Sequence, residues 1–269
     1  LARILSPGKF AVVGPAFAEY EESLLAAGNP PERVFAKEEK DFLVDREVAA
    51  EALEKRPAAV IVANPANPTG RLVPDETLDF LIERSEKDGF ALIVDEAFID
   101  FTKGRSLEKK VLTNPKLLIL RSLTKIHAIP GLRLAYLAGH PETVGGFKAI
   151  QEPWPINGMA LEAGLHCLRG AEARGRETRA AVEKLKERLV GILSPLGRLF
   201  PSDANFVLFK TGGKEARELL AGLYREGILV RDASNFKGLG EGFLRFAVRP
   251  EPELARLEEA LGDLRARTS

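Results

Sequence analysis

Four short stretches between residues 64 and 133 carry side chains that could act together on one small molecule. They are residues 64–70 (Asn-Pro-Ala-Asn-Pro-Thr-Gly), residues 95–98 (Asp-Glu-Ala-Phe), residues 122–125 (Ser-Leu-Thr-Lys) and Arg133. Each is predicted to follow a β-strand. In an open α/β sheet the loops at the carboxyl ends of the strands meet in one crevice. We therefore expect the four stretches to surround a common ligand.

Lys125 has the features of an imine-forming lysine. It follows the apolar residues 117–120, and an amine that is partly removed from water loses its proton and becomes nucleophilic more readily. Ser122 and Thr124 bring hydroxyl donors to the same turn, and the guanidinium of Arg133 suits a phosphate dianion. Together these residues predict a phosphate anchor beside a reactive amine.

Asp95 ends a run of apolar residues, 91–94, that is typical of a buried strand. A carboxylate in that position is unfavourable unless a cation lies beside it. A protonated pyridine nitrogen would supply this cation. The pair would then hold the pyridine ring as an electron sink.

Each stretch also has an ordinary structural explanation. Ser-x-Thr-Lys and Asn-Pro-Thr-Gly occur in solvated turns, Asp95 and Glu96 could cap a helix, and Arg133 could form a surface ion pair. All four occur in this order, each behind a predicted strand. That order favours one shared site over four unrelated turns.

On these residues the chain resembles the fold-type I aminotransferases of class I and II, in the branch that holds threonine-phosphate decarboxylase and histidinol-phosphate aminotransferase. The resemblance covers the whole chain and implies the cofactor pyridoxal 5'-phosphate. It implies six cofactor contacts: Lys125 as the Schiff-base lysine, Asp95 at the pyridine nitrogen, Asn67 at the ring hydroxyl, Phe17 stacked on the ring, and Ser122 with Arg133 at the phosphate.

The resemblance implies a small phosphorylated amino acid or amino alcohol as substrate. By it, Arg245 grips the substrate carboxylate, Arg231 grips a substrate phosphate and Asn157 contacts the substrate. On the residues alone, both arginines could equally be solvent-facing strand residues. Trp154 and Asn157 also fit an ordinary helix N-terminus with its flanking turn.

Three features favour the decarboxylase: Phe98, residues 153–157 and residues 245–249. The expected reaction is decarboxylation of L-threonine O-3-phosphate to (R)-1-aminopropan-2-yl phosphate for cobalamin biosynthesis. Family members usually have a tyrosine where this chain has Phe98, so a donor to the ring hydroxyl is lost. A histidinol-phosphate aminotransferase or related aminotransferase is the alternative, and a non-catalytic relative is a second one.

Family members also carry an N-terminal arm and a glycine-containing loop that cradle the cofactor phosphate. Both precede the strand that matches residues 10–13. This chain starts just after the expected place of that loop. We therefore expect the sequence as given to bind the cofactor weakly or not at all.

The order of elements predicts an α/β protein with the aspartate aminotransferase fold. A large cofactor-binding domain with a mainly parallel sheet is expected over residues 1–150, a connecting helix over 151–193 and a small α+β domain over 194–269. The clearest strands are residues 10–13, 59–63, 91–95, 117–121 and 134–138. A further strand is expected at residues 205–209, with short strands around 228–231 and 243–248. Helices are expected at residues 17–27, 74–87, 214–226 and 252–267.

Composition narrows the class of partner. The 39 basic and 39 acidic side chains cancel, which argues against nucleic acid as a ligand. Cys167 is the only cysteine, and the three histidines are not at metal-ligand spacings, so neither a disulfide nor a metal site is predicted. No apolar run approaches the roughly 18 residues of a membrane span. We expect a cytoplasmic protein without a membrane partner, and the resemblance implies a homodimer.

Overall fold

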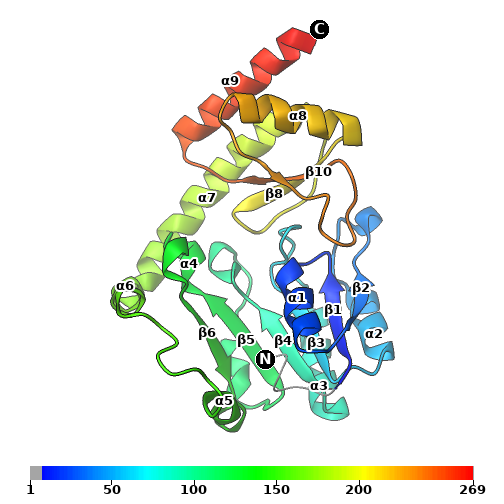
Figure 1. The fold of residues 1–269 in the computed structure, drawn as a ribbon, viewed down its shortest axis with the longest axis vertical. Coiled ribbons are helices and arrows are strands. Elements are labelled where there is room, and N and C mark those ends of the chain that lie inside the picture. Colours follow the sequence, from blue (N-terminus) through cyan, green and yellow to red (C-terminus); the bar gives the residue numbers. More distant parts are fainter. Residues whose placement is uncertain (1–7, 269) are drawn as a thin grey trace.

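Two β-sheets form the framework of the protein (Figure 1). The computed structural model describes residues 8–268. The larger sheet has the strand order β2-β1-β3-β4-β5-β6 and the smaller one the order β7-β8-β10-β9. The larger sheet consists of β1 (Phe10–Gly14), β2 (Pro31–Phe35), β3 (Ala59–Ala63), β4 (Ala91–Asp95), β5 (Leu117–Ser122) and β6 (Ala135–Gly139). The smaller sheet consists of β7 (Arg198–Leu199), β8 (Phe206–Lys210), β9 (Arg231–Asp232) and β10 (Phe243–Ala247).

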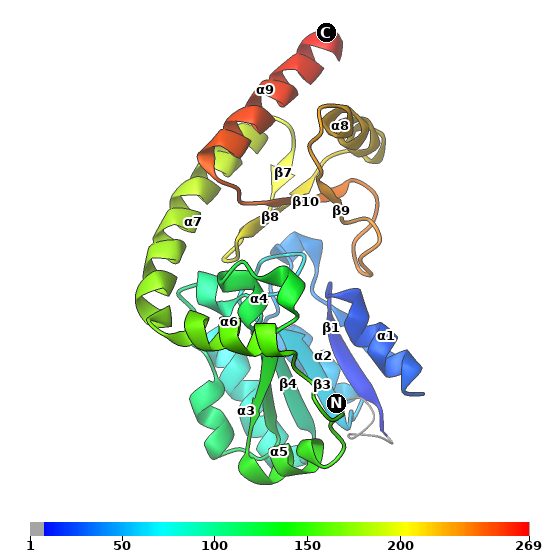
Figure 2. The same cartoon turned by 60° about the vertical axis from the view of Figure 1, so that its left-hand side comes forward.

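Helices flank both sheets, and α7 runs from one sheet to the other along the side of the molecule (Figures 1 and 2). The α-helices are α1 (Ala18–Ala26), α2 (Arg46–Glu54), α3 (Asp75–Asp88), α4 (Leu123–Ile126), α5 (Pro141–Lys148), α6 (Gly158–Leu168), α7 (Ala171–Leu193), α8 (Gly213–Arg225) and α9 (Glu251–Thr268). Short 3-10 helices lie at η1 (Glu38–Lys40), η2 (Ile99–Phe101), η3 (Glu108–Leu112) and η4 (Pro130–Leu132).

The strands β1 to β5 are parallel, and β3 and β4 are apolar along almost their whole length. This composition is expected for strands covered on both faces. Val60 and Val62 of β3 face one apolar cluster, and Ala59 and Ile61 face another. The parallel arrangement brings the carboxyl ends of β1, β3, β4 and β5 to one edge of the sheet. The mainly parallel α/β sheet predicted from the sequence is therefore confirmed.

The edge strand β6 is antiparallel to β5, and Ala135 pairs with Ser122. The start of β6 thus lies at the edge where the parallel strands end. Arg133 lies in the connection from β5 to β6, two positions before the first residue of β6. It reaches the expected edge of the sheet, since β6 runs in the opposite direction.

The smaller sheet is antiparallel and packs with one face on α7, α8 and α9. Its other face contributes Leu208 and Phe243 to the main core of the larger sheet. There the ring of Phe243 lies 5.9 Å from that of Phe42. The two sheets are therefore joined by apolar packing as well as by α7.

The segment 151–193, predicted as one connecting helix, contains two helices instead. They are separated at Gly170, whose φ of 69° is left-handed and cannot continue an α-helix. The strand predicted at residues 228–231 is reduced to the short β9. The strand β2 was not predicted, because it begins Pro-Glu-Arg and lacks an apolar pattern. No helix among residues 8–268 is long and apolar enough to cross a membrane.

Candidate active site

A cleft of about 530 Å³ lies where the carboxyl edge of the larger sheet meets the smaller sheet. Residues from both sheets and from α1 form its walls. Six of the nine site residues predicted from the sequence line this cleft: Phe17, Asn67, Asp95, Lys125, Arg231 and Arg245. The fold therefore gathers side chains that are up to 228 residues apart, from Phe17 to Arg245, around one space.

Lys125 is in the short helix α4, which begins directly after β5. Its side chain is exposed to the cleft rather than partly desolvated as expected. The Nζ atom lies 5.9 Å from the centre of the Phe98 ring. A primary amine thus stands beside an apolar wall, where it can reach a ligand bound in the cleft.

Asp95 ends β4 and holds its carboxylate between two donors. Oδ1 accepts a hydrogen bond from the Ala97 backbone N–H at 2.8 Å, and Oδ2 accepts one from the Tyr20 hydroxyl at 2.5 Å. Burial raises the pKa of Asp95, while these hydrogen bonds and the charge of Lys125 act in the opposite direction. A cationic ligand group beside this carboxylate would be stabilised.

Glu96 has a structural role on the opposite side of the chain. Its side chain is completely buried and accepts hydrogen bonds from the Ser106 hydroxyl at 2.6 Å and the Leu107 backbone N–H at 2.8 Å. Successive side chains of an extended segment point to opposite faces. Asp95 therefore lines the cleft, whereas Glu96 anchors the loop at Ser106.

The segment 64–70 is fixed against the smaller sheet. Gly70 has a φ of 75°, and a Cβ atom there would lie 2.0 Å from Oγ of Ser202. The carbonyl oxygen of Gly70 accepts a hydrogen bond from the Asp203 N–H at 2.8 Å. This close contact holds Asn67 in the cleft, where its Oδ1 accepts a hydrogen bond from Arg245.

Arg231 and Arg245 are cross-strand partners on β9 and β10, so their side chains share one face of the sheet. Burial lowers the pKa of Arg245, and the neighbouring charge of Arg231 lowers it further. Among the described residues, neither arginine forms an ion pair with a carboxylate. The alternative explanation, that both arginines simply face solvent from their strands, does not hold because both line the cleft.

Three predicted site residues do not line the cleft. Oγ of Ser122 lies 2.8 Å from Oγ1 of Thr124, and Nη1 of Arg133 donates to the Pro130 carbonyl oxygen at 2.9 Å. Both stand at the same sheet edge as Lys125. Asn157 caps α6, with its Oδ1 accepting from the Ala160 N–H at 2.8 Å. The structure thus supports the capping explanation of Asn157, and we do not assign it to the site.

Tyr20 and Asn205 are among the cleft residues that the sequence analysis did not identify. Tyr20 follows Phe17 by three residues, a spacing that puts both on one side of a helix start. Asn205 directly precedes β8, and its buried Oδ1 has no hydrogen-bond partner among residues 8–268. A buried acceptor of this kind requires a partner that a bound ligand or water could supply.

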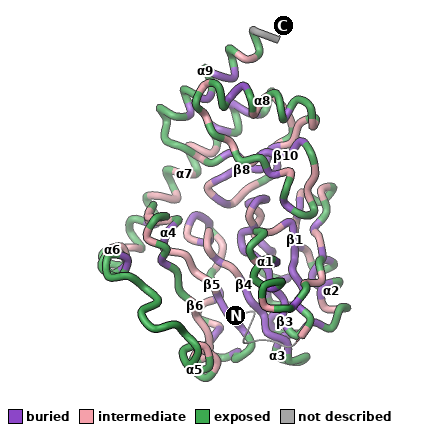
Figure 3. The backbone as a smooth tube through the Cα atoms, viewed as in Figure 1, coloured by how far each residue is buried: buried purple, intermediate pink, exposed green. Residues whose placement is uncertain are grey.

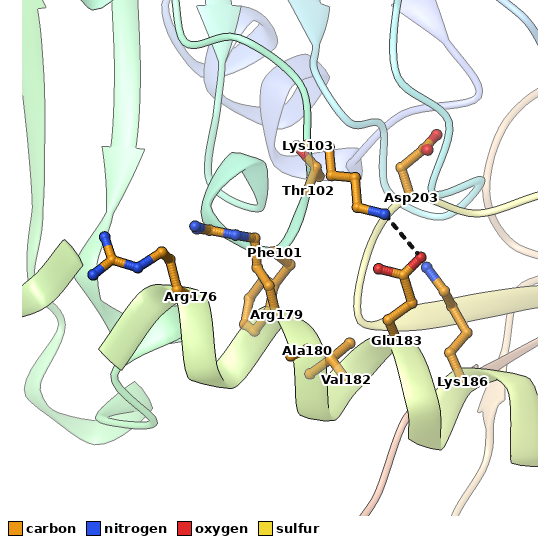
Figure 4. A pocket seen from close by; sticks show the side chains of 10 residues that line it. All are labelled: Phe101, Thr102, Lys103, Arg176, Arg179, Ala180, Val182, Glu183, Lys186 and Asp203. Carbon is orange, nitrogen blue, oxygen red and sulfur yellow. Dashed lines mark hydrogen bonds and ion pairs between the residues drawn. The ribbon is translucent and has the colours of Figure 1, made fainter. Parts of the chain in front are cut away.

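A second cavity, of about 270 Å³, lies between the η2 region and α7 (Figure 4). Its charged groups are used within the protein. Nζ of Lys103 is 3.3 Å from Oε1 of Glu183, and Nζ of Lys186 donates to the Ser202 carbonyl oxygen at 2.7 Å. These contacts tie α7 to the loops of both sheets. The main cleft remains the better candidate for a catalytic site.

The residues of the main cleft fit pyridoxal phosphate. Lys125 offers an amine for an aldehyde, Asp95 a carboxylate for a ring cation and Phe17 an aromatic face. The Oδ1 of Asn205, which has no partner within the described part of the chain, is consistent with a cleft that holds a polar ligand.

Comparisons with known proteins agree with this fit. The family model "Aminotransferase class I and II" matches residues 1–264. The chain is 32% identical over 262 residues to threonine-phosphate decarboxylase from Salmonella typhimurium, covering 96% of this chain and 71% of that protein. It is 34% identical over 237 residues to histidinol-phosphate aminotransferase from Caldanaerobacter subterraneus, covering 87% and 64%.

A solved structure gives the same result for the fold. Histidinol-phosphate aminotransferase from Clostridium acetobutylicum superimposes with a TM-score of 0.88 at 30% identity, covering 98% of this chain and 80% of that one. The chain therefore belongs to the class I and II aminotransferase family, whose cofactor is pyridoxal 5'-phosphate.

Proposed function

We propose that the protein decarboxylates L-threonine O-3-phosphate to (R)-1-aminopropan-2-yl phosphate, a reaction that would serve cobalamin biosynthesis. The observation that carries the proposal is the pair of cleft arginines, Arg231 and Arg245, which have no carboxylate partner among the described residues. Two neighbouring guanidiniums favour a ligand with two anionic groups. The proposed substrate has one carboxylate and one phosphate.

Arg245 is the better candidate for the carboxylate because it is the more deeply buried of the two and touches Asn67. Arg231 lies at the more exposed end of the pair, where a phosphate would keep part of its hydration. Binding at two points fixes the orientation of the bond between Cα and the carboxylate. The orientation of the bonds at Cα in turn decides which of them breaks.

In the proposed reaction the carboxylate leaves as carbon dioxide and a proton takes its place on Cα. The bound cofactor supplies an electron-poor ring that accepts the electron pair left on Cα. Asp95 would keep the ring nitrogen protonated, and Lys125 would hold the cofactor. Ser122 and Arg133, at the same sheet edge, are proposed to bind its phosphate.

Phe98 gives the cleft an apolar wall next to Lys125. Its ring lies 5.1 Å from that of Phe206 in an edge-on contact, and it carries no hydroxyl that could bind the cofactor. We take the absence of this hydroxyl as support for the proposed decarboxylase, because the resemblance implies a tyrosine at this position in most family members.

Histidinol-phosphate aminotransferase is the second candidate function. The structural match at a TM-score of 0.88 and the relative at 34% identity favour it. The same cleft could bind histidinol phosphate through its single phosphate. Lys125 would then have to remove the proton from Cα, and no carbon dioxide would form.

We also propose that the protein is a homodimer. The segment from Ile150 through α6 exposes many large apolar side chains, and Figure 3 shows the connection that leads from α5 into α6 as exposed. Trp154 is 93% exposed and Met159 is 74% exposed. Apolar surfaces of this extent usually mark an interaction site, and a second copy is the partner that the family resemblance implies.

The deciding experiment incubates the full protein and its cofactor with L-threonine O-3-phosphate, and separately with histidinol phosphate plus 2-oxoglutarate. We expect carbon dioxide in the first reaction and no glutamate in the second. Glutamate without carbon dioxide would establish the aminotransferase instead. Absence of both products, together with absence of bound-cofactor absorbance, would indicate a non-catalytic relative.

A further inference from the structure

The hydrogen bond between Tyr20 and Asp95 joins two elements that are 75 residues apart in the sequence. The phenol of Tyr20, in α1, donates to Oδ2 of Asp95 at 2.5 Å, and the Ala97 N–H donates to Oδ1. Both oxygens of the carboxylate are therefore held by donors. With two such contacts, the carboxylate has a fixed orientation at the cleft wall.

The phenol has a definite electrostatic effect on the carboxylate. Burial raises the pKa of Asp95, and the Tyr20 hydrogen bond is the largest of the contributions that lower it. The pKa of Tyr20 itself lies well above its usual value, first because of burial and then because of the Asp95 charge. Tyr20 thus remains a neutral donor throughout the physiological pH range and favours the ionised form of Asp95.

The position of Tyr20 is fixed by its neighbours on α1. Its ring packs edge-on against Phe17 at 6.0 Å. Oε2 of the next residue, Glu21, lies 2.7 Å from Nη2 of Arg33 on β2 and 2.7 Å from Nζ of Lys237 in the loop before β10. Figure 2 shows this loop reaching from the smaller sheet to the end of α1. The helix that carries Tyr20 is therefore tied to both sheets.

We propose that Tyr20 is a positioning residue, whose phenol keeps the Asp95 carboxylate ionised and aimed at the ring nitrogen of the cofactor. The inference rests on the role of Asp95 in the proposed function. Tyr20 acts only through Asp95 and need not touch the cofactor. Tyr224, which is 69% exposed on α8, is a matched tyrosine far from this contact.

The test compares the binding of two probes, pyridoxal 5'-phosphate and 1-deazapyridoxal 5'-phosphate, to the full protein and its variants. The probes differ only at the ring nitrogen, so the ratio of their dissociation constants reports the contact with Asp95. Wild-type protein should prefer the natural cofactor. Tyr20→Phe should reduce that preference about tenfold, as expected for loss of one hydrogen bond to a charged group, while Tyr224→Phe leaves it unchanged.

The pH profile of the preference supplies a second measurement that a purely structural role would not change. Without the phenol, the Asp95 carboxylate accepts a proton at higher pH. As the pH falls, Tyr20→Phe should therefore lose its preference for the natural cofactor before the wild type does. In an Asp95→Asn background, adding Tyr20→Phe should have no further effect on the preference. A further decrease in the double variant would show that Tyr20 acts independently of Asp95.

The outcomes separate this inference from the proposed function. The inference about Tyr20 alone would be overturned if Tyr20→Phe kept the cofactor preference and pH profile of the wild type while Asp95→Asn lost the preference. An Asp95→Asn protein that keeps the preference would overturn the role of Asp95 as well. Tyr20→Phe removes a single oxygen and leaves the ring packing against Phe17, and circular dichroism would verify that the fold is intact.

Discussion

The guanidinium of Arg245 donates a hydrogen bond to Oδ1 of Asn67 across the cleft. Asn67 lies in the loop after β3 and Arg245 lies on β10, 178 positions away. Both were predicted from the sequence to bind ligands. Here they bind each other. Because a guanidinium has five N–H donors and the Asn67 amide keeps its Nδ2 donors, both residues retain groups for a ligand while this contact persists.

The first prediction concerns the different ligand groups that the two cleft arginines bind. Arg231→Ala should raise the KM for L-threonine O-3-phosphate about a hundredfold, because one charge-assisted contact to the phosphate is lost. It should hardly alter the binding of unphosphorylated L-threonine. Arg245→Ala should weaken the binding of both compounds. Equal effects of the two variants on both ligands would contradict the assignment.

The second prediction is that Lys125 is the residue that holds the cofactor. Borohydride treatment of the full protein with pyridoxal phosphate, followed by peptide mapping, should find a pyridoxyl group on Lys125. The Lys125→Ala variant should give no adduct, whereas Lys148→Ala, which removes an exposed lysine of α5, should behave as the wild type. An adduct that persists on another lysine would show that the site is misassigned.

The third prediction concerns the stability of the protein without its cofactor. Burial raises the pKa of Asp95 in the folded protein. Above this folded-state pKa, the ionised carboxylate destabilises the fold. Below the ordinary pKa of an aspartate, the carboxylate is protonated in both states and this destabilisation is absent. Asp95→Asn should therefore raise the unfolding temperature of the cofactor-free protein by a few degrees at pH 7, but not in acid. The same change should weaken cofactor binding. Asp263→Asn, on the exposed surface of α9, is the control.

The fourth prediction concerns acid stability. Burial of Glu21 would raise its pKa, but hydrogen bonds from Arg33 and Lys237 prevail and lower it below 4.5. The contribution of Glu21 to stability is thus fully present above about pH 4.5 and is lost as the pH falls through its folded-state pKa. Glu21→Gln should cost about 1–3 kcal/mol at pH 7 and progressively less in acid.

Urea unfolding at pH 7 and pH 3 measures this difference. Glu22→Gln serves as the control, because the Glu22 side chain is exposed. A constant difference in unfolding free energy between wild type and Glu21→Gln at both pH values would argue against the ion-pair explanation.

The fifth prediction concerns the proposed homodimer. Met159→Asp introduces a charge into the exposed apolar surface of α6 and should shift the protein from dimer to monomer in sedimentation velocity. Leu229→Asp makes a matched change just before β9 of the smaller sheet, at a side chain that is 82% exposed. This variant should leave the dimer intact. A monomeric wild-type protein would refute the proposal directly.

The sequence alone was sufficient for the parallel sheet and for most of the cleft. Apolar runs such as residues 59–63 and 91–95 became β3 and β4 with unchanged bounds, because strands covered on both faces need apolar residues at every position. The polar residues that follow these strands had to reach one sheet edge. For this reason Asn67, Asp95 and Lys125 could be grouped before the structure was known.

The tertiary structure decided which side chains contact each other. The sequence has no pattern that pairs Tyr20 with Asp95 or Arg245 with Asn67, since each pair joins residues from elements that meet only when α1 and the smaller sheet dock. Local composition determines whether a segment is a strand or helix, whereas contacts across elements depend on how the elements pack.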